Sequence, residues 1–325
     1  MRCIPLRGAH AGRGTHSVAP QDIAFVLPAG ADDLTVRPLT MADAEAVTAL
    51  ARADELEVLA EPMTELVDVL GEWRRPSVDL ERDSISVWAH ERLVAQGFVA
   101  GRGSVEAVVT ADRRGRGLGT ALVAWLRATS SARGLTTMGQ TIPLESPAEA
   151  FLVAAGARAT YDSWVLELLP DHTVPTQPLP EGHVLDLARD DELPAVHRVV
   201  DDAFSAWPER EPVPYADWHA EFIEGDEAAP WQRRVVRDGA GAVVGVAMVT
   251  ASEDGMVWVN QLAVRSDRRG QGLGRALLAD SFVAGRRRGL SRAGLSTDSR
   301  TGALPLYEGV GMVVTASFRH LVLDV

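Results

Sequence analysis

The spacing of apolar residues along this chain alternates between the helical period and the short extended runs typical of strands. In the first half, one extended run precedes two stretches with apolar residues at every third or fourth position, and three runs rich in β-branched residues follow. A long helical stretch, a strand, a short helix and a final strand complete the series. The predicted strands are residues 34–39, 85–90, 93–100, 105–111, 136–142 and 159–169, and the predicted helices are residues 41–60, 63–73, 119–134 and 147–156.

The second half shows the same order of patterns, β-α-α-β-β-β-α-β-α-β. Its predicted strands are residues 183–189, 231–238, 242–250, 256–264, 290–298 and 317–325, and its predicted helices are residues 190–204, 215–223, 274–289 and 302–311. Landmarks recur at a constant offset of 155 positions, as Arg114 and Arg269, Gly134 and Gly289, and Gly156 and Gly311. A constant offset at separate points indicates a tandem duplication of one domain.

The length of 325 residues agrees with two domains of about 150 residues each. Residues 170–182 contain four prolines and are predicted to form a linker. The repeats on either side predict a first domain at residues 34–169 and a second at residues 183–325. Residues 1–33 are predicted to be a flexible tail.

Charge and cysteine content exclude several classes of function. The net charge of −13 argues against a nucleic-acid partner, although it leaves open whether the acidity attracts cationic amines or only keeps the protein soluble. All 32 basic residues are arginine, which excludes a lysine Schiff base. The single cysteine, Cys3, excludes a Cys/His zinc site and suits the cytoplasm. No apolar run reaches the ~18 residues of a membrane span, so no membrane association is expected.

A glycine-rich turn stands between a strand and a helix in both repeats, as DRRGRGLGTAL at residues 112–122 and DRRGQGLGRAL at residues 267–277. Glycines let a ligand approach the backbone closely, and the first N–H groups of the following helix point toward that ligand. Such a turn can hold a pyrophosphate. It is not a Walker A loop, which needs a lysine, and the G-x-G-x-G spacing differs from the dinucleotide fingerprint.

This turn, Arg-x-x-Gly-x-Gly, in this order of elements resembles the GNAT superfamily of acyl-CoA-dependent N-acyltransferases. The resemblance covers both repeats, and SRTGALPLYEGVGM downstream of the second turn strengthens it. It implies an α/β fold of the α+β kind, with a mixed central sheet and helices on both faces, in two tandem GNAT-like domains. It also implies acetyl-CoA as co-substrate, with no metal.

By this resemblance, main-chain groups of the second turn bind the coenzyme A pyrophosphate, and those of the preceding strand flank the pantetheine arm and polarise the thioester carbonyl. The turn residues are Arg269, Gly270, Gln271, Gly272, Leu273, Gly274 and Arg275, and the strand residues are Leu262, Ala263 and Val264. The first turn could retain the same function through Arg114, Gly115, Gly117, Gly119 and Thr120.

The repeats differ at the residue that is expected to protonate the departing thiolate. Family members commonly carry a tyrosine four residues before the late glycine, and Tyr307 stands there in the second repeat. The first repeat has Leu152 at this position, which cannot donate a proton. The second repeat departs from the family at Arg300, where an asparagine that contacts coenzyme A is common. Catalysis is therefore predicted in the second domain.

The general base is left open by the sequence. Glu253 or Asp254, before the fourth strand of the second repeat, could deprotonate the acceptor amine, although a solvated hairpin turn is the more common setting for such a pair. His219 is an alternative, whereas Asn260 and Gln261 cannot act as bases. In the first repeat, Glu106 is well placed on its strand but lacks the tyrosine.

We therefore expect a cytoplasmic N-acetyltransferase that acts on a primary amine of a small molecule or peptide, as a monomer or homodimer. Two alternatives remain: a non-catalytic acyl-CoA-binding or regulatory protein, and an enzyme similar to the mycothiol synthases, which share this two-domain division. The sequence does not identify the acceptor.

Overall fold

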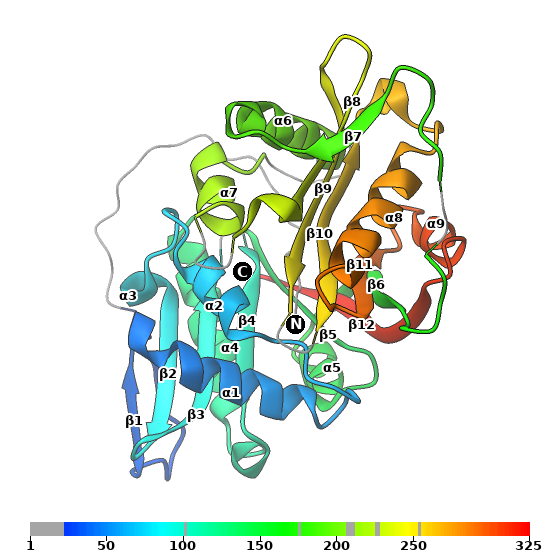
Figure 1. Ribbon diagram of the computed structural model, residues 1–325. Helices are drawn as coiled ribbons and strands as arrows, with labels where there is room; N and C mark the ends of the chain where they lie inside the picture. The colour runs from blue at the N-terminus through cyan, green and yellow to red at the C-terminus, as the bar shows by residue number, and fades with distance from the viewer. Residues whose placement is uncertain (1–22, 101–102, 175–176, 206–211, 225–227, 253–254) are drawn as a thin grey trace. The chain divides into compact units, whose positions relative to one another are not determined.

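The computed structural model describes residues 23–100, 103–174, 177–205, 212–224, 228–252 and 255–325 (Figure 1). The chain forms two compact units. The first unit comprises Met1–Thr160 together with Phe318–Val325, and the second unit comprises Tyr161–Ser317.

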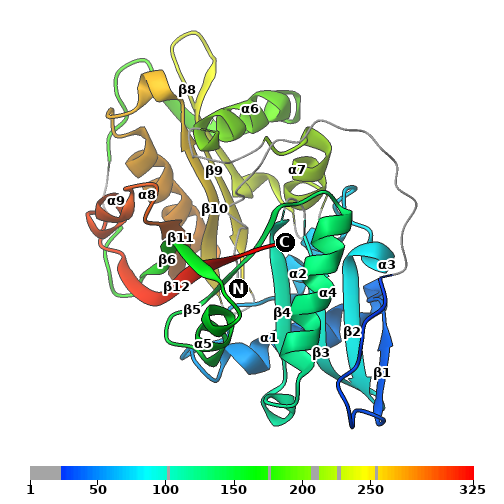
Figure 2. The same ribbon diagram turned by 180° about the vertical axis from the view of Figure 1, so that it is seen from behind.

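The first unit contains an antiparallel sheet in the order β1-β2-β3-β4, with β5 beyond it paired to the end of β12. Its strands are β1 (Leu34–Arg37), β2 (Ser84–Ala89), β3 (Arg92–Val99), β4 (Val105–Val109), β5 (Thr137–Pro143) and the Phe318–Asp324 part of β12 (Val313–Asp324). Its α-helices are α1 (Ala44–Glu55), α2 (Leu66–Trp73), α3 (Leu80–Asp83), α4 (Leu118–Ala132) and α5 (Pro147–Ala154). Helices α1 and α2 lie in front of the sheet in Figure 1, and α4 covers the opposite face in Figure 2.

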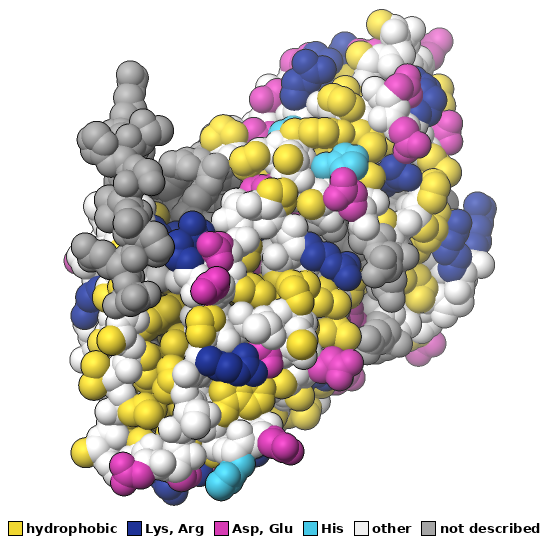
Figure 3. All heavy atoms as spheres, turned by 90° about the vertical axis from the view of Figure 1, so that its left-hand side faces the viewer, with side chains coloured by type: hydrophobic (Ala, Val, Ile, Leu, Met, Phe, Trp, Pro, Cys, Tyr) yellow, Lys and Arg dark blue, Asp and Glu magenta, His cyan; other side chains and the backbone are white. Residues whose placement is uncertain are grey.

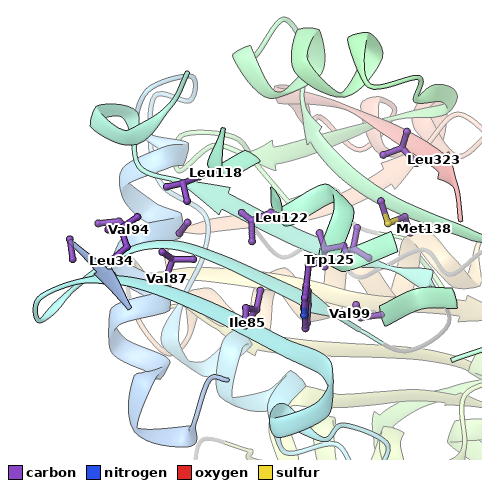
Figure 4. Close-up of a cluster of buried hydrophobic side chains, with 14 residues drawn as sticks. Leu34, Ile85, Val87, Val94, Val99, Leu118, Leu122, Trp125, Met138 and Leu323 are labelled. Atoms are coloured by element: carbon purple, nitrogen blue, oxygen red, sulfur yellow. The ribbon is translucent and has the colours of Figure 1, made fainter. Parts of the chain in front are cut away.

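Each face of this sheet has its own apolar core. Leu118, Leu122 and Trp125 of α4 pack on side chains of β2 and β3 such as Ile85 and Val94 (Figure 4). On the other face, side chains of α1 and α2 form a second buried cluster together with side chains of β3. Alternation of side chains along the strands supplies both faces.

The second unit contains one mixed sheet in the order β6-β11-β10-β9-β8-β7, where β10 and β11 are parallel and the other pairs are antiparallel. Its strands are the Tyr161–Leu168 part of β6 (Arg158–Leu168), β7 (Val184–Leu187), β8 (Arg233–Arg237), β9 (Val243–Ala251), β10 (Met256–Val264) and β11 (Arg292–Asp298). Its α-helices are α6 (Leu193–Phe204), α7 (Tyr215–Phe222), α8 (Leu273–Arg286) and α9 (Leu304–Glu308).

Helices α6 and α7 pack on one face of this sheet, and α8 packs on the other. Val196 of α6 and Trp218 of α7 share a buried cluster with Ala263 of β10, whereas Leu278 of α8 shares a separate cluster with Val259. The predicted fold class, a mixed sheet with helices on both faces, is therefore confirmed.

The last strand of each repeat does not lie wholly in the unit formed by the rest of that repeat. Leu168 of β6 pairs with Ala293 of β11 in the second unit, and Phe318 of β12 pairs with Pro143 of β5 in the first unit. The compact units therefore differ from the domains expected at residues 34–169 and 183–325. Local apolar patterning predicts that a segment is a strand, but it does not determine which strand it pairs with.

The segment before β1 differs in part from the flexible tail expected for residues 1–33. Residues 1–22 lie outside the described part of the chain, but Ile23, Phe25 and Leu27 pack against the core cluster beneath α4. The indole N–H of Trp125 donates to the carbonyl of Ile23 at 3.2 Å. No helix in the described ranges is both long and apolar enough to cross a membrane.

Candidate functional site

Strands β10 and β11 of the second unit separate beyond Val259. Their parallel pairing runs from Met256 with Arg292 to Val259 with Leu295. The register of β10 against β9 shifts between Val259 and Gln261, which marks a bulge at Asn260. Beyond the bulge, β10 pairs with β9 alone among the described strands, so one edge of its backbone is left for a ligand.

The second glycine-rich turn, Arg269–Arg275, lies between the end of β10 and the start of α8. Gly272 precedes the first residue of α8 with φ +81°, a left-handed conformation that a side chain would strain. The N–H groups of the first helical turn, at Leu273, Gly274 and Arg275, have no partner within the helix. The turn therefore presents hydrogen-bond donors and the positive end of the helix dipole together.

Little protein lies against this second turn. A Cβ on Gly270 would meet no atom within 4 Å, and one on Gly274 would meet nothing closer than 3.9 Å. Gly272 faces the amide end of Gln177, whose Nε2 would lie 2.8 Å from such a Cβ. Because a glutamine side chain can rotate away, the turn has room for a ligand.

Two arginines of this turn make different contacts. Arg269 donates to main-chain carbonyls, to Val264 at 3.2 Å and to Ala203 at 3.4 Å, which ties the turn to β10 and α6. Arg275 is exposed, and no carboxylate in the described ranges forms an ion pair with it. One of its guanidinium nitrogens lies near Gly309, just after α9. Arg275 thus offers a positive charge between the turn and α9.

Tyr307 lies on α9, and its side chain packs in the apolar cluster of β10, β11 and α8 with 8% of its surface exposed. Within the described ranges its hydroxyl has no hydrogen-bond partner. Burial, together with the negative charge of Asp298, raises the pKa of Tyr307 to about 12. The hydroxyl is therefore protonated at neutral pH and is free to donate to a ligand.

Arg300, which replaces the asparagine common in the family, is held by neighbouring side chains. Its guanidinium pairs with the buried Asp298 carboxylate at 2.8 Å and lies 3.6 Å from the centre of the Tyr161 ring. These contacts fix Arg300 at the end of β11.

The candidates for the general base lie in different settings. Glu253 and Asp254 lie outside the described residues. His219 on α7 contacts Glu224, with 3.0 Å between Nδ1 and Oε1. On β10, the amide oxygen of Gln261 accepts a hydrogen bond from the Trp218 indole at 3.0 Å, and both side chains are buried. This bond locks Gln261 in place.

The turn of the first unit has the same backbone, and protein lies against two of its three glycines, whereas a Cβ on Gly115 would meet no atom within 4 Å. Gly117 has φ +87°, close to the value at Gly272, but a Cβ there would lie 3.0 Å from Pro28. The ring of Phe151 on α5 lies across Gly119, 3.3 Å from the position of a Cβ. Local patterning predicts neither contact, because each side chain comes from a segment distant from the turn.

Further contacts in the first unit occupy the positions that are open around the second turn. The amide of Gln140 on β5 donates to the carbonyl of Ala107 on β4 at 3.3 Å and so bridges these two strands. The equivalent strands of the second unit, β10 and β11, have no such bridge beyond Val259 among the described residues. Arg114 forms ion pairs with Asp54 at 2.7 Å and with Glu57 at 2.6 Å. The equivalent residue of the second unit, Arg269, donates only to main-chain carbonyls. These carboxylates would repel a pyrophosphate.

Two other positions in the first unit also differ from the second. Thr120 stands where the second turn has Arg275, and Leu152 packs against the core where the second unit has Tyr307. No group of three or more His, Cys, Asp or Glu side chains in the described part of the chain is placed to hold a metal ion.

Comparison with known proteins relates one part of this chain to a family by sequence and the whole chain to solved structures by fold. Residues 193–312 match the model of the acetyltransferase (GNAT) family. A GCN5-related N-acetyltransferase from Sphaerobacter thermophilus is similar in structure, with 27% identity, a TM-score of 0.74 and coverage of 90% of this chain and 96% of that one.

More distant structures share the fold alone. A tandem GNAT protein from the clavulanic acid biosynthesis pathway has 19% identity, a TM-score of 0.69 and coverage of 90% of this chain and 98% of that one. Saccharomyces cerevisiae N-myristoyltransferase, solved with bound myristoyl-CoA and inhibitors, has 11% identity, a TM-score of 0.67 and coverage of 90% and 80%. No curated protein matches the sequence. Residues 193–312 therefore form a domain of the GNAT acetyltransferase family, and the chain as a whole shares its fold with a tandem GNAT protein.

Proposed function

We propose that the second unit is an N-acetyltransferase, which moves an acetyl group from acetyl-CoA to a primary amine of a small molecule or peptide. Two observations together support this proposal. The turn before α8 is open to a ligand, and the hydroxyl of the buried Tyr307 side chain has no hydrogen-bond partner in the described ranges. Arg275 lies between them, with its guanidinium near Gly309.

The residues of the second unit would divide the work as follows. The N–H groups from Arg269 to Arg275 hold the pyrophosphate, and the Arg275 side chain adds positive charge. The free edge of Leu262, Ala263 and Val264 hydrogen-bonds the pantetheine arm and polarises the thioester carbonyl. The acceptor amine attacks that carbonyl directly.

Tyr307 would donate a hydrogen bond, and then a proton, to the sulfur as it leaves. A free thiol has a pKa of about 8.5, so a phenol with a pKa of about 12 would not protonate a thiolate in water. A thiolate released into apolar surroundings has a raised proton affinity as well, because desolvation acts on both anions. The apolar packing around Tyr307 therefore supports transfer at this position.

We propose Glu253 as the general base, with Asp254 and His219 as alternatives. A base accepts the proton that the ammonium form must lose before attack. The first unit would carry out no acetyl transfer, because Pro28, Phe151 and Gln140 cover its turn and bridge its strands.

One observation favours a second function, that of a non-catalytic acyl-CoA-binding protein. The strand position occupied by Glu106 in the first repeat is Gln261 in the second, and an amide cannot accept the proton of an amine. The second unit would then bind acyl-CoA without transferring the acyl group.

Thiol release from acetyl-CoA, measured with a panel of primary amines, separates the two functions. Amine-dependent release supports the transferase, and titration calorimetry measures acetyl-CoA binding in the same preparation. Tight binding with no release for any amine would favour the binding protein instead.

A further inference from the structure

The linker of residues 170–182 belongs to the second unit and lies against its helix α8 (Figure 1). At the last residue of that helix, the Arg286 guanidinium donates to the main-chain carbonyl of His172 at 2.6 Å. Further along the linker, Leu179 packs on the apolar cluster that contains Leu273, the first residue of α8. The described linker residues are therefore held at both ends of the helix.

This course places Gln177 at the second glycine-rich turn. Its amide nitrogen Nε2 would lie 2.8 Å from a Cβ built on Gly272, and its Cδ would lie 3.3 Å from the same position. The next residues, Leu273 and Gly274, carry N–H groups that have no partner within the helix. Hydrogen-bond donors from a side chain and from the main chain therefore lie next to each other at the start of α8.

The Gln177 amide makes little use of its donors within the described ranges. Its one hydrogen bond there is long, from Nε2 to the carbonyl of the adjacent Pro178 at 3.4 Å. An amide nitrogen carries two N–H groups, so at least one of them has no acceptor in these ranges. A phosphate oxygen is anionic and accepts several hydrogen bonds, so one phosphate can satisfy the side-chain and main-chain donors together.

The first unit has a different residue at the same place. The segment before its first strand also lies against the helix that follows the turn, since the Trp125 indole of α4 donates to the carbonyl of Ile23 at 3.2 Å. This segment meets Gly117, the equivalent of Gly272, through Pro28, whose Cβ would lie 3.0 Å from a Cβ there. A proline ring is rigid and has no donor. An apolar ring thus stands in the first unit where the second unit has an amide.

We propose that Gln177 is a binding residue of the second unit, which donates a side-chain N–H to the pyrophosphate of coenzyme A. The side chain turns from Pro178 toward the phosphate when the coenzyme binds, and Leu179 keeps the main chain beside α8. The proposal rests on the proposed function in that the second turn must hold coenzyme A. It adds a donor that the glycine-rich motif does not contain, from a segment far from the turn in sequence.

Titration calorimetry of the full chain with coenzyme A tests the proposal. We expect Gln177→Leu to weaken binding about tenfold, because it removes a donor to a charged group. The melting temperature without ligand should stay unchanged, because the one hydrogen bond of this side chain in the described ranges is long and exposed. Thr173→Val is the matched control: it removes an exposed hydroxyl from the same linker and should leave binding unchanged.

Gln177→Arg and a second ligand provide further readouts. Arginine keeps N–H donors and adds a positive charge, so this variant should bind coenzyme A at least as tightly as the unmodified chain, with a steeper dependence on salt. Weaker binding than in Gln177→Leu would contradict a donor role. With 3′-dephospho-coenzyme A, which retains the pyrophosphate, Gln177→Leu should cause the same loss of affinity.

A loss confined to coenzyme A itself would place Gln177 at the 3′-phosphate and overturn the proposal, as would unchanged binding of both ligands in Gln177→Leu. The outcome is distinguishable from failure of the transferase. Binding that depends on Gln177, without amine-dependent thiol release, would support this proposal and refute acetyl transfer. Thiol release together with unchanged binding in Gln177→Leu would do the reverse, and the absence of coenzyme A binding to the unmodified chain would overturn both.

Discussion

Tyr307 and Leu152 stand at equivalent places in the two repeats, four residues before a glycine, in different chemical settings. The Tyr307 side chain is buried, its hydroxyl has no hydrogen-bond partner in the described ranges, and the turn of its unit is open. Leu152 packs against the apolar core of the first unit, whose turn is covered by Phe151 and Pro28. The proposed reaction needs both a proton donor and an open acyl-CoA site, and only the second unit combines the two.

Replacing Tyr307 by phenylalanine should lower kcat about 10²–10⁴-fold, because the ring still fills its place but lacks the hydroxyl that we propose as the proton donor to the thiolate. Acetyl-CoA binding should survive. Tyr215→Phe, on α7 and 38% exposed, is a matched control that should keep its activity. Thiol release and calorimetry measure the two effects, and an unchanged kcat in Tyr307→Phe would refute the role of the acid.

Gly272 and Gly117 allow the same substitution to be compared in both turns. Valine at either position is strained by about 1–2 kcal/mol, because both glycines have left-handed φ angles. Gly272→Val should also weaken acetyl-CoA binding at least about tenfold by filling the proposed pyrophosphate site. Gly117→Val should destabilise the protein without changing that affinity. Equal losses of affinity in calorimetry would show that both turns bind acetyl-CoA.

At the scale of elements, the last strand of each repeat, β6 or β12, completes the core of the unit formed by the other repeat. Leu166 of β6 belongs to the first repeat in sequence but is fully buried in the core of the second unit, paired with Leu295 of β11. Leu323 of β12 belongs to the second repeat but is buried in the core of the first unit, paired with Met138 of β5. Each unit therefore depends on a strand from the other repeat.

Leu166→Ala should destabilise the second unit by about 2–5 kcal/mol, since it creates a cavity in that core. Hydrogen exchange should then accelerate in β11 more than in β5. Leu323→Ala is the complementary variant and should accelerate exchange in β5 more than in β11. If Leu166→Ala exposes β5 instead, the assignment of β6 to the second unit is wrong.

At the scale of the whole molecule, the net charge of −13 is carried by a surface of mixed sign. Figure 3 shows arginine and acidic side chains dispersed among apolar ones on the face it presents, with no continuous basic area among the described residues there. The positive charge that matters for an anionic co-substrate is local: the amides of the second turn and the guanidinium of Arg275.

The chain should bind one acetyl-CoA, although the glycine-rich turn occurs twice. Pro28, Phe151 and Gln140 obstruct the first site, and Asp54 and Glu57 beside Arg114 oppose a pyrophosphate there. Titration calorimetry should give a stoichiometry near one per chain. Two sites of similar affinity would contradict the closure of the first unit.

Much of the architecture could be predicted from the sequence because it depends on local patterns. The 155-residue offset, the order of strands and helices and the left-handed glycines of both turns follow from apolar period and from the residue type at each position. The difference between Tyr307 and Leu152 is visible in the same way, because a phenol can donate a proton and an alkyl group cannot.

Only the tertiary structure decided which turn is open and which sheet receives each final strand. Pro28 and Phe151 meet the first turn from segments far from it in sequence, and Gln140 reaches β4 from a strand more than thirty positions away. Such contacts depend on how elements pack, which local patterning does not encode. The sequence by itself determined that this protein carries two copies of a glycine-rich turn, and a tyrosine four residues before the late glycine in one repeat and a leucine in the other. Long-range packing determined that Pro28 and Phe151 lie against the first turn.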